Sequence, residues 1–181
     1  MSGNLEDKEQ TYRIRFRNSR ATEITFGTEP DGWYSGLPSK ASLDVVFTQS
    51  KDTELGFYLD GKGGKDDFTI TLSIMSQIYI YEDDEQIYPS WQDPRETKGN
   101  NSATEKQEFK FRFVNECESE VTFGLEPWGL FYSIPSRSHL DIFFSQKEND
   151  QLIVNIDRDS TVILDLYNIL SVYIDDDIYL P

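Results

Sequence analysis

The side chains best suited to hold a ligand are carboxylates that stand close to aromatic residues, and the chain presents this combination twice. The segment Glu29-Pro-Asp-Gly32 is followed by Trp33 and Tyr34, and the segment Glu126-Pro-Trp-Gly129 is followed by Tyr132. A carboxylate beside an aromatic ring is a common way to hold a sugar or a cation. The candidate binding residues at these two corners are therefore Glu29, Trp33, Tyr34, Glu126, Trp128 and Tyr132.

The same two segments also fit a purely structural role. Proline at the second position and glycine at the fourth position favour a type I turn, and Pro38 and Pro135 stand shortly before the next expected strands. Glutamate is not a preferred turn-opening residue, as aspartate, asparagine or serine would be. Its presence at both corners exceeds what a turn requires, so a rigid corner and a binding corner both stay open.

Two acidic runs form a second group of candidates. Glu82-Asp-Asp-Glu85 follows Tyr-Ile-Tyr at 79–81, and Asp175-Asp-Asp177 follows Tyr-Ile at 173–174. Their oxygen atoms could hold Ca²⁺, although the spacing differs from that of an EF-hand loop, and a solvated acidic turn is the alternative. The candidate binding residues in these runs are Asp83, Asp84, Asp175, Asp176 and Asp177.

The residues needed for known catalytic centres are scarce. The chain has one histidine, His139, and one cysteine, Cys117, whereas zinc and cupin-type metal centres need several such ligands. No nucleophile elbow accompanies His139 and Asp141, and the glycine-rich run at 61–65 lacks the strand-to-helix context of a phosphate-binding loop. We therefore expect no catalytic residue, no metal and no cofactor.

The chain contains a repeat that organises these candidates. Residues 13–49 match residues 110–146 at a constant offset of 97 without a gap. The hairpin at 60–67 is expected to be three residues shorter in the second copy, so that the match resumes at an offset of 94. A fixed-period self-match predicts two homologous units. The expected divisions are a disordered tail at 1–10, a first unit at 11–89, a polar linker at 90–107 and a second unit at 108–181.

Apolar residues alternate with polar ones through both copies, as Ile14 and Phe16 or Phe111 and Phe113 illustrate. Alternation over short segments separated by turn residues is typical of half-buried strands. The predicted fold is all-β, with two tandem homologous antiparallel β-sandwich or small-barrel domains. A unit of roughly 75 residues is marginal alone, so the units are expected to pack on each other or on another chain.

A row of arginines lies on one face of the first expected strand. Arg13, Arg15 and Arg17 alternate with Ile14 and Phe16. They are expected either to pair with acidic residues on neighbouring strands or to form an interface between copies or subunits.

The second corner resembles a pattern found in small bacterial β-proteins that are described as cupin-like. The resemblance rests on the sequence Phe-Gly-Leu-Glu-Pro-Trp-Gly at 123–129, which is followed by a proline and an apolar strand. The first copy departs from the pattern at Asp31, where the pattern has tryptophan, and Ser39 and Ser136 stand where it prefers glycine. The resemblance implies a bacterial source and a compact β-fold, and it implies no activity.

Composition restricts the kind of partner. The net charge is −16, which disfavours direct binding to nucleic-acid phosphates and favours a basic partner, although acidity also serves solubility. A single cysteine fits a reducing compartment, and no apolar run reaches the roughly 20 residues of a membrane helix. We expect a cytoplasmic protein that binds neither membranes nor nucleic acid directly.

Three hypotheses about function follow. The first is a non-enzymatic bacterial protein-binding module, such as an immunity protein or an inhibitor of a basic toxin or nuclease, with mimicry of nucleic acid as its sharper form. The second is a module that binds sugars or small molecules near the Glu-Pro corners. The third is a structural or accessory subunit that forms homo-oligomers through the repeat.

Overall fold

A computed structural model describes residues 10–49, 54–61, 68–89, 107–146, 151–157, 161–166 and 168–180. Within these ranges the chain forms sixteen strands and no helix, so no helix that could cross a membrane occurs there. The predicted tail and linker lie outside the described residues, except that Gln10 and Gln107 each begin a strand. The predicted all-β class is confirmed.

The strands of the first half follow the alternating runs of the sequence, because β-branched and aromatic residues pack well on one face of a pleated strand. They are β1 (Gln10–Asn18), β2 (Ile24–Glu29), β3 (Trp33–Leu37), β4 (Ser42–Gln49), β5 (Glu54–Asp60), β6 (Thr69–Ser73), β7 (Ile78–Glu82) and β8 (Glu85–Tyr88).

The second half, residues 107–180, repeats this order of elements. Its strands are β9 (Gln107–Asn115), β10 (Val121–Glu126), β11 (Leu130–Ile134), β12 (His139–Gln146), β13 (Gln151–Ile156), β14 (Thr161–Asp165), β15 (Ile169–Ile174) and β16 (Asp177–Leu180).

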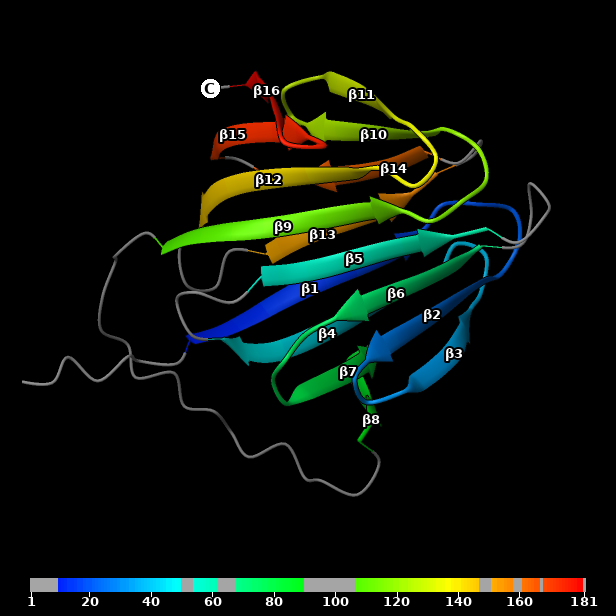
Figure 1. The fold of residues 1–181 in the computed structure, drawn as a ribbon. Coiled ribbons are helices and arrows are strands. Elements are labelled where there is room, and N and C mark those ends of the chain that lie inside the picture. Colours follow the sequence, from blue (N-terminus) through cyan, green and yellow to red (C-terminus); the bar gives the residue numbers. More distant parts are fainter. Residues whose placement is uncertain are drawn as a thin grey trace, which may run out of the picture.

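The strands form two sheets that face each other (Figure 1). Sheet A has the order β11-β10-β14-β13-β1-β4-β7-β8, and sheet B has the order β16-β15-β12-β9-β5-β6-β2-β3. Each sheet takes four strands from each half, so the arrangement is one sandwich built from both halves rather than one sandwich from each. The sheets have free edges and do not close into a barrel, so the small-barrel alternative is wrong.

The prediction of purely antiparallel sheets is also wrong. Four pairs of neighbouring strands are parallel, namely β1 with β13, β10 with β14, β2 with β6 and β5 with β9. Two of these pairs, β1–β13 and β5–β9, join the halves. Alternation in a sequence reports which face of a strand is buried, and it carries no information on the direction of the neighbouring strand.

One hydrophobic core lies between the sheets and draws on both halves. The ring of Phe57 lies 5.8 Å from that of Phe111 and 5.7 Å from that of Phe113, and Tyr12 meets Phe109 edge-on at 4.7 Å. Aromatic pairs at such distances add to the energy of apolar burial. The halves therefore stabilise each other through shared aromatic packing as well as through strand pairing.

The strand pairing corrects the expected match after the hairpin at 60–67. Leu59 pairs with Ile70 in the first half, and Ile156 pairs with Val162 in the second. Ile70 and Val162 are separated by 92 residues, so the later offset is 92 rather than 94. Because side chains alternate with a period of two, a slip of two residues leaves the pattern of buried positions unchanged, and the pattern alone cannot separate the two offsets.

Candidate functional site

The two Glu-Pro corners are built alike. The Glu29–Pro30 and Glu126–Pro127 peptide bonds are cis. Gly32 and Gly129 close the corners with φ of 66° and 62°, a region that glycine enters without steric cost. The sequence indicates a proline corner, but it does not report the isomer of the bond before the proline.

At the first corner, Trp33 and Tyr34 were both predicted to bind a ligand. They point to opposite faces of sheet B, as successive residues of a strand do. Trp33 packs inward against the rings of Phe26 and Tyr88. Tyr34 is 48% exposed on the outer face, and its hydroxyl donates a 2.8 Å hydrogen bond to Glu29 Oε1. This hydrogen bond is the main reason why the pKa of Tyr34 is raised. Glu29 and Tyr34 thus form a pair from which Trp33 is excluded.

At the second corner the predicted aromatic residues are also divided. Trp128 is 54% exposed and donates from Nε1 to the carbonyl oxygen of Leu166 at 3.2 Å. Tyr132 packs against the core and meets the ring of Tyr179 edge-on at 6.2 Å, and burial raises its pKa. In the described part of the chain no hydrogen bond joins Glu126 to either ring. The predicted cluster of Glu126, Trp128 and Tyr132 is therefore an edge of the molecule rather than a pocket.

The outer face of sheet A beside this corner carries an aromatic residue that the sequence reasoning missed. Phe131 is 57% exposed and lies over Gly124, where an added Cβ would come within 2.8 Å of the ring. Gly124 pairs with Phe131 on one side and with Ile163 on the other, and two residues further on Glu126 pairs with Asp165. Phe131, Ile163, Glu126 and Asp165 therefore share one face. The glycine at matching positions of both copies was the available signal.

The two acidic runs form exposed two-residue hairpin turns. Asp83 and Asp84 connect β7 to β8, and Asp175 and Asp176 connect β15 to β16, all four with positive φ. Asp175 accepts a 2.9 Å hydrogen bond from the backbone N–H of His139, and its Oδ1 lies 3.2 Å from His139 Nδ1. Among the described residues no group of three or more potential ligands is placed to hold a metal ion. Calcium binding at these turns stays a hypothesis.

The arginine row is paired with a buried carboxylate in the first half. Arg15 Nε and Nη2 each donate to Asp44 at 2.7 Å, and Arg13 Nη2 lies 3.1 Å from the same carboxylate and 3.6 Å from Asp84. Asp44 is only 5% exposed. The predicted cross-strand pairing is confirmed for Arg13 and Arg15. Arg17 lies exposed on the same face, and a role for the row in an interface stays a prediction.

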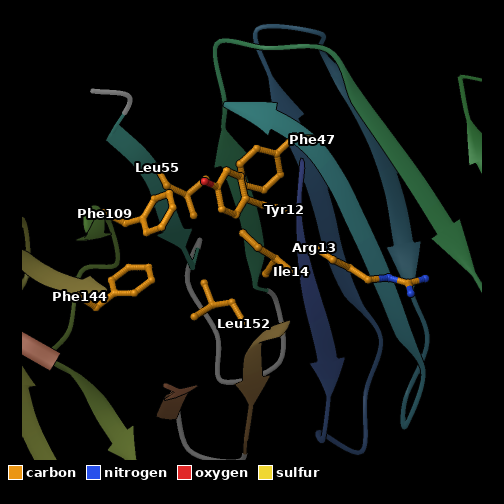
Figure 2. A pocket seen from close by; sticks show the side chains of 8 residues that line it. All are labelled: Tyr12, Arg13, Ile14, Phe47, Leu55, Phe109, Phe144 and Leu152. Atoms are coloured by element: carbon orange, nitrogen blue, oxygen red, sulfur yellow. The ribbon is translucent and has the colours of Figure 1, made fainter. Parts of the chain in front are cut away.

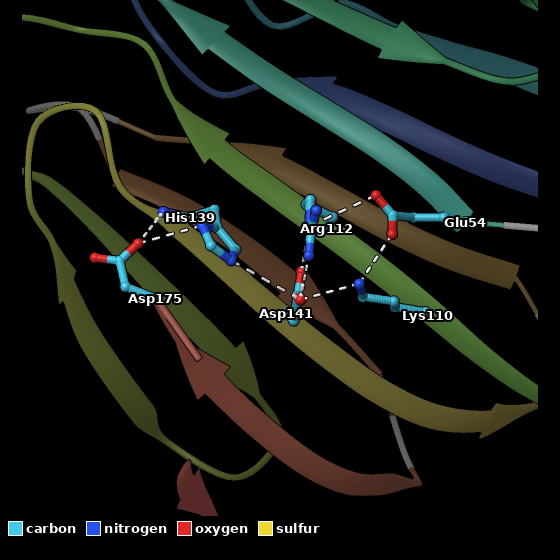
Figure 3. Close-up of polar contacts among 6 residues, drawn as sticks. All are labelled: Glu54, Lys110, Arg112, His139, Asp141 and Asp175. Atoms are coloured by element: carbon cyan, nitrogen blue, oxygen red, sulfur yellow. Dashed lines mark hydrogen bonds and ion pairs between the residues drawn. The ribbon is translucent and has the colours of Figure 1, made fainter. Parts of the chain in front are cut away.

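The second half holds the same arrangement with one contribution from the first half. Arg112 donates two 2.7 Å hydrogen bonds to Asp141 (Figure 3). Lys110 Nζ lies 3.0 Å from the carboxylate of Asp141 and 2.9 Å from that of Glu54 on β5. Burial acts to raise the pKa of Asp141, but the hydrogen bonds and charges of Arg112 and Lys110 outweigh it and lower that pKa. These cations are engaged in fixing β5, β9 and β12 together.

Two buried asparagines, absent from the sequence-based candidates, hold the loops that precede the corners. Asn115 Nδ2 donates to the carbonyl oxygens of Ser119, Ile134 and Pro135, and its Oδ1 accepts from the N–H of Cys117. Asn18 makes the same four contacts in the first half. Side chains that form hydrogen bonds with buried backbone groups have a structural role. These asparagines therefore position the corners rather than contact a ligand.

A small apolar cavity of about 20 Å³ lies where the halves meet between the sheets (Figure 2). Four aromatic and three aliphatic residues line it, together with Arg13, whose guanidinium group points away from the cavity. They are Tyr12, Ile14, Phe47, Leu55, Phe109, Phe144 and Leu152. Ligand pockets usually exceed about 300 Å³, so this cavity is a feature of core packing.

We compared the chain with models of protein families, with curated proteins and with solved structures. None of the three comparisons gives a match. The resemblance of the second corner to cupin-like β-proteins therefore stays a prediction, and a function must be argued from the geometry of the chain itself.

The single cysteine and the single histidine both have protein partners. Cys117 is buried, its Sγ lies 3.6 Å from the carbonyl oxygen of Leu59, and burial raises the pKa of its thiol, which disfavours the reactive thiolate. His139 lies between two carboxylates, those of Asp141 and Asp175. Exposed aromatic rings occur on β11 at Phe131 and on β16 at Tyr179.

Proposed function

We propose that the protein is a non-enzymatic binding protein whose partner is a basic protein. An immunity protein or inhibitor that blocks a basic toxin or nuclease is the form that we favour. The observation that carries the proposal is a surface that we call the acidic aromatic edge. It comprises β11, β16 and the residues that flank them in the two sheets, where three rings are more than half exposed and four carboxylates occur, namely Trp128, Phe131, Tyr179, Glu126, Asp165, Asp176 and Asp177.

The rings of this edge are unusual for a surface. Trp128, Phe131 and Tyr179 are 54%, 57% and 56% exposed, whereas most other large apolar side chains of the described residues lie in the core. Aromatic residues are enriched at protein interfaces relative to the rest of a protein surface. The rings are therefore the expected anchors of a protein contact.

The carboxylates indicate the charge of the partner. Glu126 and Asp165 lie side by side on the outer face, and no described lysine or arginine forms an ion pair with either. The turn at Asp175–Asp177 adds exposed negative charge at the start of β16. Unneutralised carboxylates at a contact surface steer a partner of positive charge and accelerate its association.

We further infer that the two halves arose by tandem duplication and that the second one carries the binding edge. The offset of 97 and the matching strand pairings support the duplication. The first half lacks the edge because Asp31 stands in place of Trp128, Ser73 stands in place of Asp165, and Tyr34 is engaged with Glu29.

A pull-down from cells of the native host tests the proposal. The tagged full chain is expected to retain a basic protein at about 50 mM salt and to release it at about 500 mM, because contacts between exposed charges are screened. The triple variant Asp175→Asn, Asp176→Asn and Asp177→Asn should retain less of it. Retention that is independent of salt and of these substitutions would contradict an acidic contact surface.

A further inference from the structure

We propose that the basic partner docks by adding an extended segment to sheet A along strand β11. The inference rests on the proposed function, because it takes the partner to be a basic protein, and it specifies how that partner binds. Strand addition uses backbone hydrogen bonds for affinity and alternate side chains for specificity.

Strand β11 is an open and unprotected edge. It pairs with β10 on one side, and no described strand pairs with its other side. Leu130–Ile134 contains no charged residue and no proline, and its register with β10 is regular from Leu125↔Leu130 to Val121↔Ile134. Native proteins usually guard such edges with charges, prolines or bulges, because unpaired backbone groups invite another strand.

Two of the other three edge strands begin with a charged residue, which is Glu85 in β8 and Asp177 in β16. Strand β3, which occupies the matching edge of the first half, has its outer face covered by the carboxylate of Glu23. An added Cβ at Gly36 would lie 2.6 Å from Glu23 Oε1. Strand β3 also lacks a charged residue, and a proline follows both β3 and β11, so the edge of β11 is set apart by its exposed Phe131 on the face that carries Glu126 and Asp165.

The groups around β11 fit a segment in which cationic and apolar residues alternate. On the outer face such a segment would place every second side chain beside Phe131, and Glu126 on β10 and Asp165 on β14 share that face beyond β11. A guanidinium group can lie on an exposed phenylalanine ring and also meet a carboxylate. On the inner side the alternate residues would meet the Tyr132 and Tyr179 rings, where apolar side chains fit. The net charge of −16 further favours a cationic segment over a second copy of this chain.

A synthetic nonapeptide of alternating arginine and valine, acetylated and amidated at its ends, is a direct probe. We expect it to bind the full chain at low salt and to slow amide hydrogen exchange at residues 130–134, because newly paired N–H groups are protected. A peptide of the same charge with proline in place of valine lacks every second N–H donor, and it should bind at least about tenfold more weakly.

The repeat provides a matched control variant. Phe131→Lys places a positive charge on the β11 edge and should weaken binding of the arginine–valine peptide by about tenfold or more. Tyr34→Lys makes the same change at the matching position of β3 and should leave binding unchanged. Both side chains are about half exposed, so neither change removes a core residue.

The outcomes separate this inference from the proposed function. Strand addition is supported if slowed amide hydrogen exchange is confined to residues 130–134 and if Phe131→Lys, but not Tyr34→Lys, weakens peptide binding. If the peptide binds without slowing exchange in β11, or if the proline peptide binds equally well, strand addition is wrong, while the salt-sensitive pull-down still decides whether a basic partner exists. Absence of binding at low salt also overturns strand addition.

Discussion

Asn115 and Asn18 show how single side chains hold the corners in place. Each amide group bonds three carbonyl oxygens and one N–H group of the adjoining segments. A buried backbone group left unpaired costs more than the hydrogen bond itself contributes. One asparagine therefore connects the end of β9 to the loop before β10 and to the end of β11.

Replacing Asn115 by alanine should destabilise the protein by about 2–4 kcal/mol, because several backbone groups lose their partner at once. Asn18→Ala should have an effect of similar size. The measurement is urea unfolding followed by tryptophan fluorescence. Asn155 is half-buried on β13, and Asn155→Ala should change stability by less than about 1 kcal/mol. Equal effects of all three substitutions would contradict the role assigned to Asn18 and Asn115.

Asp141 predicts how stability depends on pH. Burial raises its pKa, but Arg112 and Lys110 more than compensate, so the pKa in the folded protein lies below the value of about 4 in the unfolded chain. The stabilisation is therefore complete above about pH 4 and is lost as the pH falls through the lower folded pKa. Asp141→Asn should cost about 1–3 kcal/mol at pH 7 and progressively less at acidic pH.

Unfolding curves of the wild type and of Asp141→Asn between pH 7 and pH 2.5 measure this difference. Asp177→Asn, at an exposed turn, is the control and should keep the wild-type profile. A constant difference between Asp141→Asn and the wild type over the whole range would show that the carboxylate contributes no pH-dependent stability.

At the scale of the elements, the period-two pattern predicted which segments form strands and which residues are buried. Ile14, Phe16, Phe111 and Phe113 lie in the core as their alternation indicates. The pattern could not assign strands to sheets or give their direction, because both depend on how the loops cross from one sheet to the other. It also could not fix the offset after the hairpin, since slips of two residues are invisible to it.

Parts of the candidate site could be predicted from the alternation of side chains along a strand, and the rest depended on the strand topology. Glu29 and Tyr34 stand five residues apart, and strand pairing across the corner brings them together on one face. Adjacent strand residues alternate, so Trp33 and Tyr34 could not both face one ligand, a constraint that the sequence already contained. Phe131 was missed because its exposure follows from the open edge of sheet A, and edges are set by the topology.

At the scale of the whole molecule, matching pairings join the two halves at two places. Strand β1 pairs with β13 through Ile14↔Leu152, and β9 pairs with β5 through Phe111↔Leu55. Each pairing is the other shifted by 97 residues with the halves exchanged. Each half supplies four strands to each sheet. Without the other half, both of these four-stranded parts would lose the strand that pairs with their inner edge. Cooperative unfolding of both halves together is the physical consequence.

This dependence predicts that neither half is a folded monomer. A chain cut between residues 90 and 106 should give two fragments that, at low concentration, lack dispersed amide signals in NMR spectra. Each would expose β1 or β9 together with its half of the aromatic core, and units of this size bury too little surface alone. An equimolar mixture should recover the dispersed spectrum and elute as a 1:1 complex, because β1–β13 and β5–β9 can pair again.

Phe57→Ala removes the ring that meets Phe111 and Phe113, so it should weaken the complex by roughly 3–5 kcal/mol. A fragment that folds as a monomer, or two separate unfolding transitions in the intact chain, would show that the halves are independent.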